Sequence, residues 1–161
     1  MMASAAALAT AFGDDFFWVE YTHSDVEEYA RGFLDLQFGY PRRDYVLYVV
    51  QTKIDKARAP EGKQVLHIYA FAPYDLKDGG AKRWDEIGQE VADGFLEDIR
   101  SITTNMGDEN ILGRSFMTPL DIERHNPAMI KGDFLHFAMY NWQIGGNRPL
   151  PGWSSYRMRA S

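Results

Sequence analysis

The sequence of 161 residues contains no cysteine. Disulfides, thiolate catalysis and cysteine-based metal sites are therefore excluded, and nothing indicates an oxidising compartment. Histidine is also scarce, with four residues in the whole chain. No two of them have the spacing of metal ligands on a helix, and no His-Glu-x-x-His motif occurs. The sequence therefore predicts no metal site.

Phosphate-binding loops are absent too. The chain has neither a Gly-x-Gly-x-x-Gly fingerprint nor a Walker-type loop, so it offers no phosphate cradle of its own. The pairs Gly79-Gly80 and Gly145-Gly146 are isolated and typical of flexible loops. Ser115 and Ser154 lack the context of a nucleophile elbow, so hydrolase chemistry has little support.

Positive charge is in deficit. The chain carries 17 basic and 23 acidic residues, a net charge of −6, and no basic stripe, so we expect no nucleic-acid partner. No apolar run approaches the roughly 18 residues of a membrane span. Residues 1–12 look superficially like a signal peptide but lack a basic start, so we expect a frayed beginning or a helix turn. We expect a cytoplasmic protein.

The length and composition suit one globular domain, which we place at residues 1–161 with residues 1–15 poorly ordered. Aromatic residues are abundant at 14% of the chain. Such a content indicates a large core or, alternatively, a ligand cavity or a partner surface.

Local patterns predict helices and strands in the order β-α-β-β-α-(β)-α-β. We expect a helix capped by Ser24 with Glu27 in a capping box and ended by Gly39. A long helix carries an apolar stripe from Trp84 to Ile102, and a short one begins at Thr118-Pro119. Apolar and β-branched runs predict strands at residues 16–22, 45–51, 64–72, 111–117 and 134–140.

These elements lack strict βαβ alternation, so they favour an α+β fold. We expect a mixed or mostly antiparallel sheet with two long helices packed on it. Gly88 and Gly94 weaken the long helix but would permit close packing on the sheet. Within the strand at 64–72, His67 alternates with Val65 and Tyr69, which favours a satisfied or edge histidine over a ligand.

Residues 118–156 contain a series of features in a fixed order. A Thr-Pro helix start is followed by a turn with acidic and basic residues, by Gly-Asp and by an apolar strand that carries a histidine. After the strand come a Gln, an Arg-Pro pair, Pro-Gly-Trp and finally Tyr-Arg. This order resembles the late segment of the phytoene-desaturase-like flavoproteins, FAD-dependent oxidoreductases that include carotenoid desaturases, carotene ketolases and retinol saturase. Weaker likeness lies upstream in Gly39-Tyr40-Pro41 with Asp44, in residues 59–66 and in residues 72–76. The resemblance covers about residues 39–156.

The resemblance implies a substrate-binding domain, a sheet with helices that roofs a flavin ring. It implies FAD as cofactor and an apolar small-molecule substrate such as a polyene or isoprenoid. The sequence departs from the family in lacking the opening Rossmann fingerprint and a second Gly-rich flavin-contacting segment after Tyr156-Arg157. We therefore expect FAD to be held mainly by a separate Rossmann-type chain or a missing segment.

Carried over residue by residue, the resemblance places seven side chains near the flavin. His136 and Arg148 also admit a structural explanation, as a packed histidine and as a surface arginine paired with an acid. The catalytic residues stay unknown. The substrate-binding candidates are Phe134, His136, Phe137, Met139, Gln143 and Trp153, and the cofactor-binding candidate is Arg148.

Two alternative functions from different classes follow. The resemblance implies that the chain is a portion or subunit of an FAD-dependent oxidoreductase, inactive without an FAD-binding partner chain in a hetero-oligomer. Alternatively, it is a non-enzymatic α+β module that binds an apolar small molecule or a protein. An enclosed apolar pocket would favour the second function, whereas an exposed apolar face would count against it. Asp121, Glu123 and Arg124 beside the helix start at Thr118 are expected to serve helix capping rather than catalysis.

Overall fold

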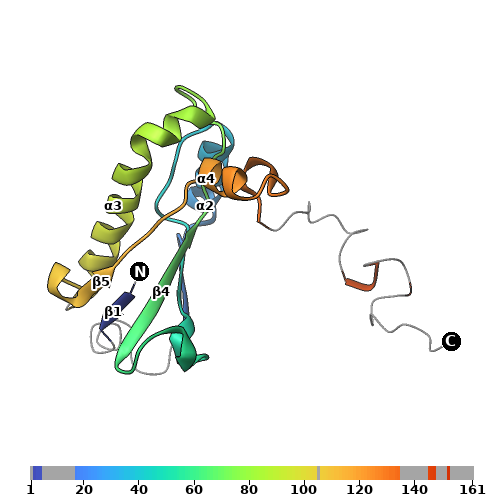
Figure 1. Ribbon diagram of the computed structural model, residues 1–161. Coiled ribbons are helices and arrows are strands. Elements are labelled where there is room, and N and C mark those ends of the chain that lie inside the picture. Colours follow the sequence, from blue (N-terminus) through green and yellow to red (C-terminus); the bar gives the residue numbers. More distant parts are fainter. Residues whose placement is uncertain (1, 5–16, 105, 135–144, 148–151, 153–161) are drawn as a thin grey trace.

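A computed structural model of the chain describes residues 2–4, 17–104, 106–134, 145–147 and 152. The fold is α+β, as the sequence predicted. Five strands form one sheet in the order β2-β3-β4-β1-β5, and Figure 1 shows the long helix α3 running along it. Every strand pair is antiparallel, which confirms a mostly antiparallel sheet.

Four of the strands were expected from their composition. They are β2 (Trp18–Tyr21), β3 (Val46–Val50), β4 (Lys63–Ala70) and β5 (Ile111–Gly113), the last shorter than the expected 111–117. The register sets Trp18 opposite Val49, and Val49 opposite His67. β3 lies between β2 and β4 and is largely buried, as a strand of uninterrupted apolar residues should be.

The expectation of a frayed beginning or a helix turn at the start of the chain was wrong for residues 2–4. Residues 2–4 are not a frayed start or a helix turn, because Met2–Ser4 form β1 between β4 and the short strand β5 (Ile111–Gly113). Three residues carry too little local preference to reveal a strand, and here the pairing with two neighbours supplies it. The rest of residues 1–15 lies outside the described part of the chain.

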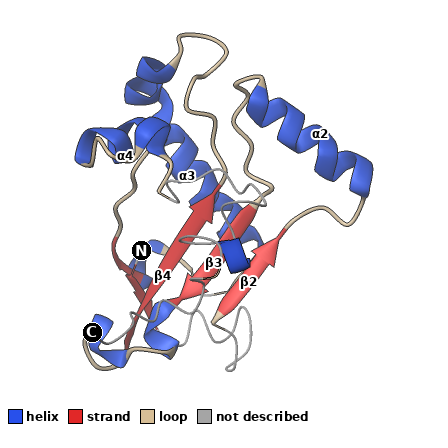
Figure 2. Ribbon diagram, turned by 90° about the vertical axis from the view of Figure 1, so that its right-hand side faces the viewer, coloured by secondary structure: helices blue, strands red, loops and turns tan. Residues whose placement is uncertain are grey.

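One face of the sheet is covered by α3 (Trp84–Ile102), which lies behind the strands in Figure 2. The core between them consists of fully or nearly fully buried side chains from both layers: Val46, Tyr48, Val50, Leu66, Leu96, Ile99 and Met106. Burial raises the pKa of Tyr48 to about 12. We call this side of the sheet the covered face.

A second, smaller core joins the start of α3 to α4 (Pro119–His125) and to the loop after β4. It is built on Leu76, Trp84 and Leu120. The N-cap Thr118 and Asp121 form the reciprocal capping box at the start of α4, which supports the capping interpretation of Asp121. Arg124 donates two hydrogen bonds to Asp85 of α3, at 2.5 and 2.9 Å.

Helix α2 (Val26–Gln37) begins one residue later than expected. Its N-cap is Asp25, not Ser24, because the Asp25 carboxylate accepts from the backbone N–H groups of both Glu27 and Glu28. Gly39 ends the helix with a positive φ of 84°, as predicted. An added Cβ there would also lie 2.4 Å from the backbone nitrogen of Lys77. Both the positive φ and this close approach therefore require glycine.

α2 contacts the sheet through aromatic rings rather than a broad apolar stripe. Its Phe33 packs against Tyr45 before β3 and Phe71 after β4, with ring centroids 5.2 and 5.6 Å apart. Gly32 is its one buried residue among those the structure describes in this helix. Several apolar positions of α2 therefore face outward, including Val26, Tyr29 and Leu34.

The two glycines of α3 do allow close packing, but not on the sheet. An added Cβ at Gly88 would lie 2.7 Å from a methyl carbon of Thr118, and one at Gly94 would lie 1.8 Å from the Arg43 guanidinium. The last apolar position of the predicted stripe, Ile102, is 46% exposed. Across the described ranges, no helix combines the length and apolar character needed to cross a membrane.

Candidate functional site

The side of the sheet opposite α3 carries a group of apolar and aromatic side chains, which we call the open face. Residues alternate between the two faces of a strand, so the neighbours of the buried Tyr48 and Leu66 point the other way. In Figure 2 these strands lie in front of α3. The open face consists of Trp18 on β2, Leu47 and Val49 on β3, His67 and Tyr69 on β4, and Phe134, which contacts Tyr69. Val49, between Trp18 and His67, is only 9% exposed.

The register arranges five of these residues in two rows across the strands. Trp18, Val49 and His67 form one row, and Leu47 and Tyr69 form the next, with the exposed Glu20 at the edge strand. Trp18 remains 54% exposed and Tyr69 remains 37% exposed. A cluster of exposed large aromatic groups of this kind marks a binding surface. The high aromatic content therefore serves a surface as well as a core.

His67 is the polar centre of the open face. Its Nδ1 lies 3.0 Å from the amide nitrogen of Gln51 and 3.0 Å from the hydroxyl of Tyr69. Burial lowers the pKa of His67, and the positive charge of Arg58 acts in the same direction. The imidazole is thus neutral at physiological pH, which makes it a hydrogen-bonding group rather than a cation.

Of the seven site residues predicted from the sequence, the structure describes one. Phe134 lies in a turn, 53% exposed, with its ring centroid 6.2 Å from that of Tyr69. Its place beside the open face agrees with a ligand-contacting role, which stays a prediction. The other six lie outside the described residues, as does nearly all of the strand expected at residues 134–140: His136, Phe137, Met139, Gln143, Arg148 and Trp153.

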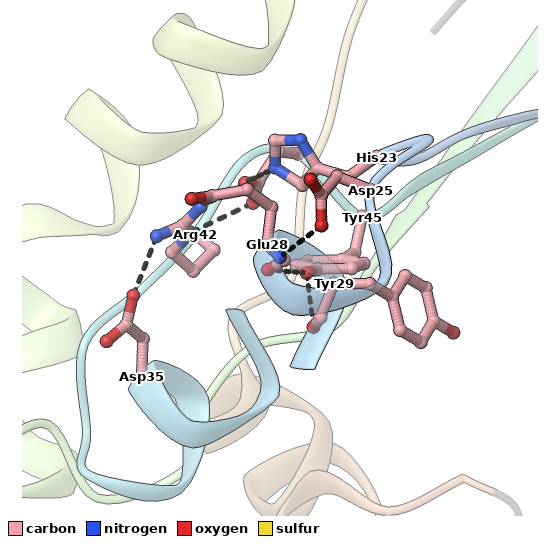
Figure 3. A network of polar contacts seen from close by, with 8 residues as sticks. His23, Asp25, Glu28, Tyr29, Asp35, Arg42 and Tyr45 are labelled. Atoms are coloured by element: carbon pink, nitrogen blue, oxygen red, sulfur yellow. Dashed lines mark hydrogen bonds and ion pairs between the residues drawn. The ribbon is translucent and has the colours of Figure 1, made fainter. Parts of the chain in front are cut away.

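A charged network fixes the loops on either side of α2, as Figure 3 shows. Arg42 donates from Nε to Asp44 at 3.0 Å and from Nη1 to Asp35 at 2.6 Å. His23 Nε2 lies 2.5 Å from the second carboxylate oxygen of Asp44, which also contacts Arg42. The hydroxyl of Tyr45 donates to two carbonyls of α2, those of Glu28 and Tyr29. These polar groups all have protein partners, so the network holds α2 against the sheet.

This network makes stability depend on pH. The guanidinium of Arg42 lowers the pKa of Asp44 to about 2, against the opposing effect of burial, and His23 adds to the lowering. A carboxyl whose pKa is lower in the folded state stabilises the fold above its unfolded pKa of about 4, and that contribution is lost as pH falls toward 2. We expect Asp44→Asn to cost about 1–2 kcal/mol at pH 7, and this difference to shrink toward zero near pH 2.

Urea unfolding followed by circular dichroism at pH 7, 4 and 2.5 measures that difference. The control is Asp108→Asn, because the Asp108 side chain is 93% exposed in its ion pair with Arg100. An exposed pair contributes little, so this variant should follow the wild type at each pH. A constant penalty for Asp44→Asn across the whole range would contradict the role assigned to its carboxylate.

The hollows in the protein surface bear on whether the chain has an enclosed ligand pocket. Two hollows border α3, and both are lined mainly by charged side chains. The first, of about 480 Å³, contains Asp93, Arg100, Asp108 and Arg114, which pair with one another as Arg100–Asp108 and Arg114–Asp93. Within the described ranges no group of three or more His, Asp or Glu is arranged to hold a metal ion. Among the described residues, neither of these two hollows is the closed apolar pocket that the non-enzymatic alternative calls for, and Trp18, Tyr69 and Phe134 are exposed.

Two curated proteins are similar to this chain over most of its length. One is the pyridine nucleotide-disulfide oxidoreductase domain-containing protein 2 of Rattus norvegicus, 31% identical over 130 residues, which are 79% of this chain and 22% of that protein. The other is a limonene dehydrogenase subunit of Castellaniella defragrans, 26% identical over 127 residues, which are 76% of this chain and 23% of that protein.

The chain thus spans less than a quarter of the length of these relatives. No protein-family model matches it. No solved structure matches it either. The relatives support an oxidoreductase-like relationship in general and do not single out the phytoene-desaturase-like family. The chain is distantly related to oxidoreductases.

Proposed function

We propose that this chain is the substrate-domain portion or subunit of an FAD-dependent oxidoreductase of the phytoene-dehydrogenase type, acting on an apolar substrate. FAD would be held mainly by a separate Rossmann-type chain or segment, and the open face would lie toward the flavin and the substrate. The observation that carries the proposal is a sheet with one face buried under α3 and the other presenting Trp18, Tyr69 and Phe134 to the outside.

Three further observations support it. Both similar proteins carry oxidoreductase or dehydrogenase in their names, and one is named as a subunit. The match covers less than a quarter of each, which leaves ample length elsewhere for a dinucleotide-binding fold. The outward apolar residues of α2 provide a second surface that another domain or chain could cover. The redox chemistry would be that of the flavin, and the open face would position an apolar substrate against it.

Co-expression tests the proposal. The tagged chain is produced alone and together with an FAD-binding chain that carries a Gly-x-Gly-x-x-Gly fingerprint and is encoded beside it. We expect the chain alone to purify colourless and the pair to purify as a yellow complex with a flavin absorption band. If no pairing yields bound flavin, and no adjoining or continuous reading frame encodes such a fingerprint, the proposal is wrong.

Two variants test whether the open face contacts the FAD-binding chain. Trp18→Asp puts a charge on the open face at a side chain that is already 54% exposed, so the fold should survive while the complex is lost. Ile102→Asp makes a comparable change at a 46% exposed residue of α3, on the opposite side of the sheet, and should leave the complex intact. Equal loss of flavin in both variants would indicate damage to folding instead of to the interface.

A further inference from the structure

The protonation state of His67 follows from a chain of hydrogen bonds that begins at Arg58. Arg58 Nη1 lies 2.9 Å from Oε1 of Gln51. A guanidinium has donors only, so the Gln51 atom facing it must be the amide oxygen. The amide nitrogen of Gln51 therefore faces His67, at 3.0 Å from Nδ1. Arg58 thus fixes which way the Gln51 amide points, as a hydrogen-bond network must do for this side chain.

The orientation of Gln51 selects the tautomer of His67. The Gln51 amide nitrogen can only donate, so Nδ1 of His67 must accept and cannot carry a proton. The single proton of the neutral ring then sits on Nε2. Protonation of Nδ1 would set two donors against each other, which agrees with the lowered pKa of this histidine. Within the described part of the chain, no hydrogen-bond partner of Nε2 is found.

The strand neighbours of His67 in its own row are apolar, while the charge of Arg58 lies behind Gln51 on the Nδ1 side of the ring. Val49 is opposite His67 on β3, and Trp18 is opposite Val49 on β2, so the row across three strands holds no charge. Tyr69 follows two residues along β4, its hydroxyl directed at Nδ1 and its ring in contact with Phe134. A neutral donor framed by aromatic and aliphatic groups matches an uncharged acceptor on an apolar molecule, because a charged ligand would find no counter-charge in this row.

We propose that the open face binds an apolar carbonyl compound, with Nε2–H of His67 donating a hydrogen bond to the carbonyl oxygen. This inference rests on the proposed function in taking that compound to be the substrate. Gln51 and Arg58 are positioning residues, since they act on the ligand through the tautomer of His67. An unsaturated hydrocarbon would use the aromatic walls of the face but leave the donor without a partner.

A matched pair of probes tests the site on the intact chain: 2-acetylnaphthalene, which carries a carbonyl group, and 2-ethylnaphthalene, which lacks it. We expect the wild type to bind the ketone about tenfold more tightly, the effect of one hydrogen bond. In His67→Phe this preference should be lost and the hydrocarbon should bind at least as tightly, because the carbonyl oxygen is left without a donor. Ile102→Ala changes an exposed residue of α3 on the opposite side of the sheet and should keep the preference. Equal binding of both probes by the wild type would overturn the inference.

Two spectroscopic measurements test the donor role on the wild-type protein, so they do not require any variant to fold. The infrared carbonyl stretch of bound 2-acetylnaphthalene should shift to lower frequency in the wild type, as hydrogen bonding weakens the C=O bond. Long-range proton–nitrogen correlation spectra should show the His67 ring protonated at Nε2. A ring protonated at Nδ1, or a carbonyl stretch identical to that in an apolar solvent, would each refute the donor role.

The outcome separates this inference from the proposed function. A ketone preference without any flavin complex would keep the His67 site and remove the flavin partner. A yellow complex that shows no ketone preference would keep the flavin partner and remove the His67 site.

Discussion

Replacing Trp84 by alanine is expected to reduce the free energy of unfolding by about 3–5 kcal/mol, the range found when a buried tryptophan is truncated. Trp84 is 3% exposed and packs with Leu76 and Leu120, so it joins the start of α3 to α4 and to the loop after β4. Its indole N–H also donates to the carbonyls of Pro73 at 3.0 Å and Tyr74 at 3.2 Å. Truncation removes the packing and leaves both carbonyls without this donor.

Urea or thermal unfolding followed by far-ultraviolet circular dichroism measures this loss. Trp84→Phe keeps a ring and removes the N–H, so it should cost about 1–2 kcal/mol plus a part of the packing. Trp18→Ala removes the same side chain from a site that is 54% exposed and should cost about 1 kcal/mol or less. If Trp84→Ala were no worse than Trp18→Ala, the second core would not be holding α3 to α4.

The sequence predicts well those elements whose signals are local. α3 and α4 carry a helical apolar period and a Thr-Pro start, and both occur at the expected residues. β3 and β4 are runs of β-branched and aromatic residues, and both overlap the expected ranges. In each case the preference of the segment agrees with its tertiary surroundings, so local reasoning suffices.

Elements that depend on distant contacts were missed. Residues 2–4 gain their strand conformation from β4 and β5, which lie far along the chain. The N-cap of α2 fell to Asp25 rather than Ser24, since both residues are good caps and only the geometry decides between them. Helix α2 was expected to pack on the sheet, yet Val26, Tyr29 and Leu34 remain exposed, because the sequence does not show which side of a helix another element covers.

The candidate site shows the same limit. Alternation along β4 placed His67 on one face with Tyr69, but favoured a satisfied or edge histidine. Its tautomer depends on Gln51, sixteen residues earlier, and on Arg58, which orients that amide. In the sequence, Gln51 and Arg58 are only two polar residues that follow β3. Nothing in their spacing indicates that they determine the tautomer of a histidine on the next strand. The arrangement of side chains on this face is therefore set by strand register more than by any motif.

Gly32→Ala should destabilise the protein by about 2 kcal/mol, although alanine favours a helix over glycine by about 1 kcal/mol. A Cβ at this position of α2 would lie 2.2 Å from the hydroxyl oxygen of Tyr45 and 2.3 Å from a ring carbon. Tyr45 cannot move easily, because it is 6% exposed and its hydroxyl donates to the carbonyls of Glu28 and Tyr29. Overpacking of about 1–3 kcal/mol and weakened hydrogen bonds therefore outweigh the gain in helix propensity.

Gly94→Ala is the matched control, since it makes the same substitution in the interior of α3. There the added Cβ meets the end of the Arg43 side chain, which is 48% exposed and free to shift. The ion pair of Arg43 with Asp98 is worth at most about 1 kcal/mol at such exposure, so this variant should stay within about 1 kcal/mol of the wild type. Tyr45→Leu in the Gly32→Ala background completes a double-mutant cycle. Because leucine removes the colliding ring, the two changes together should cost less than their sum, and strict additivity would show that Tyr45 does not impose the glycine.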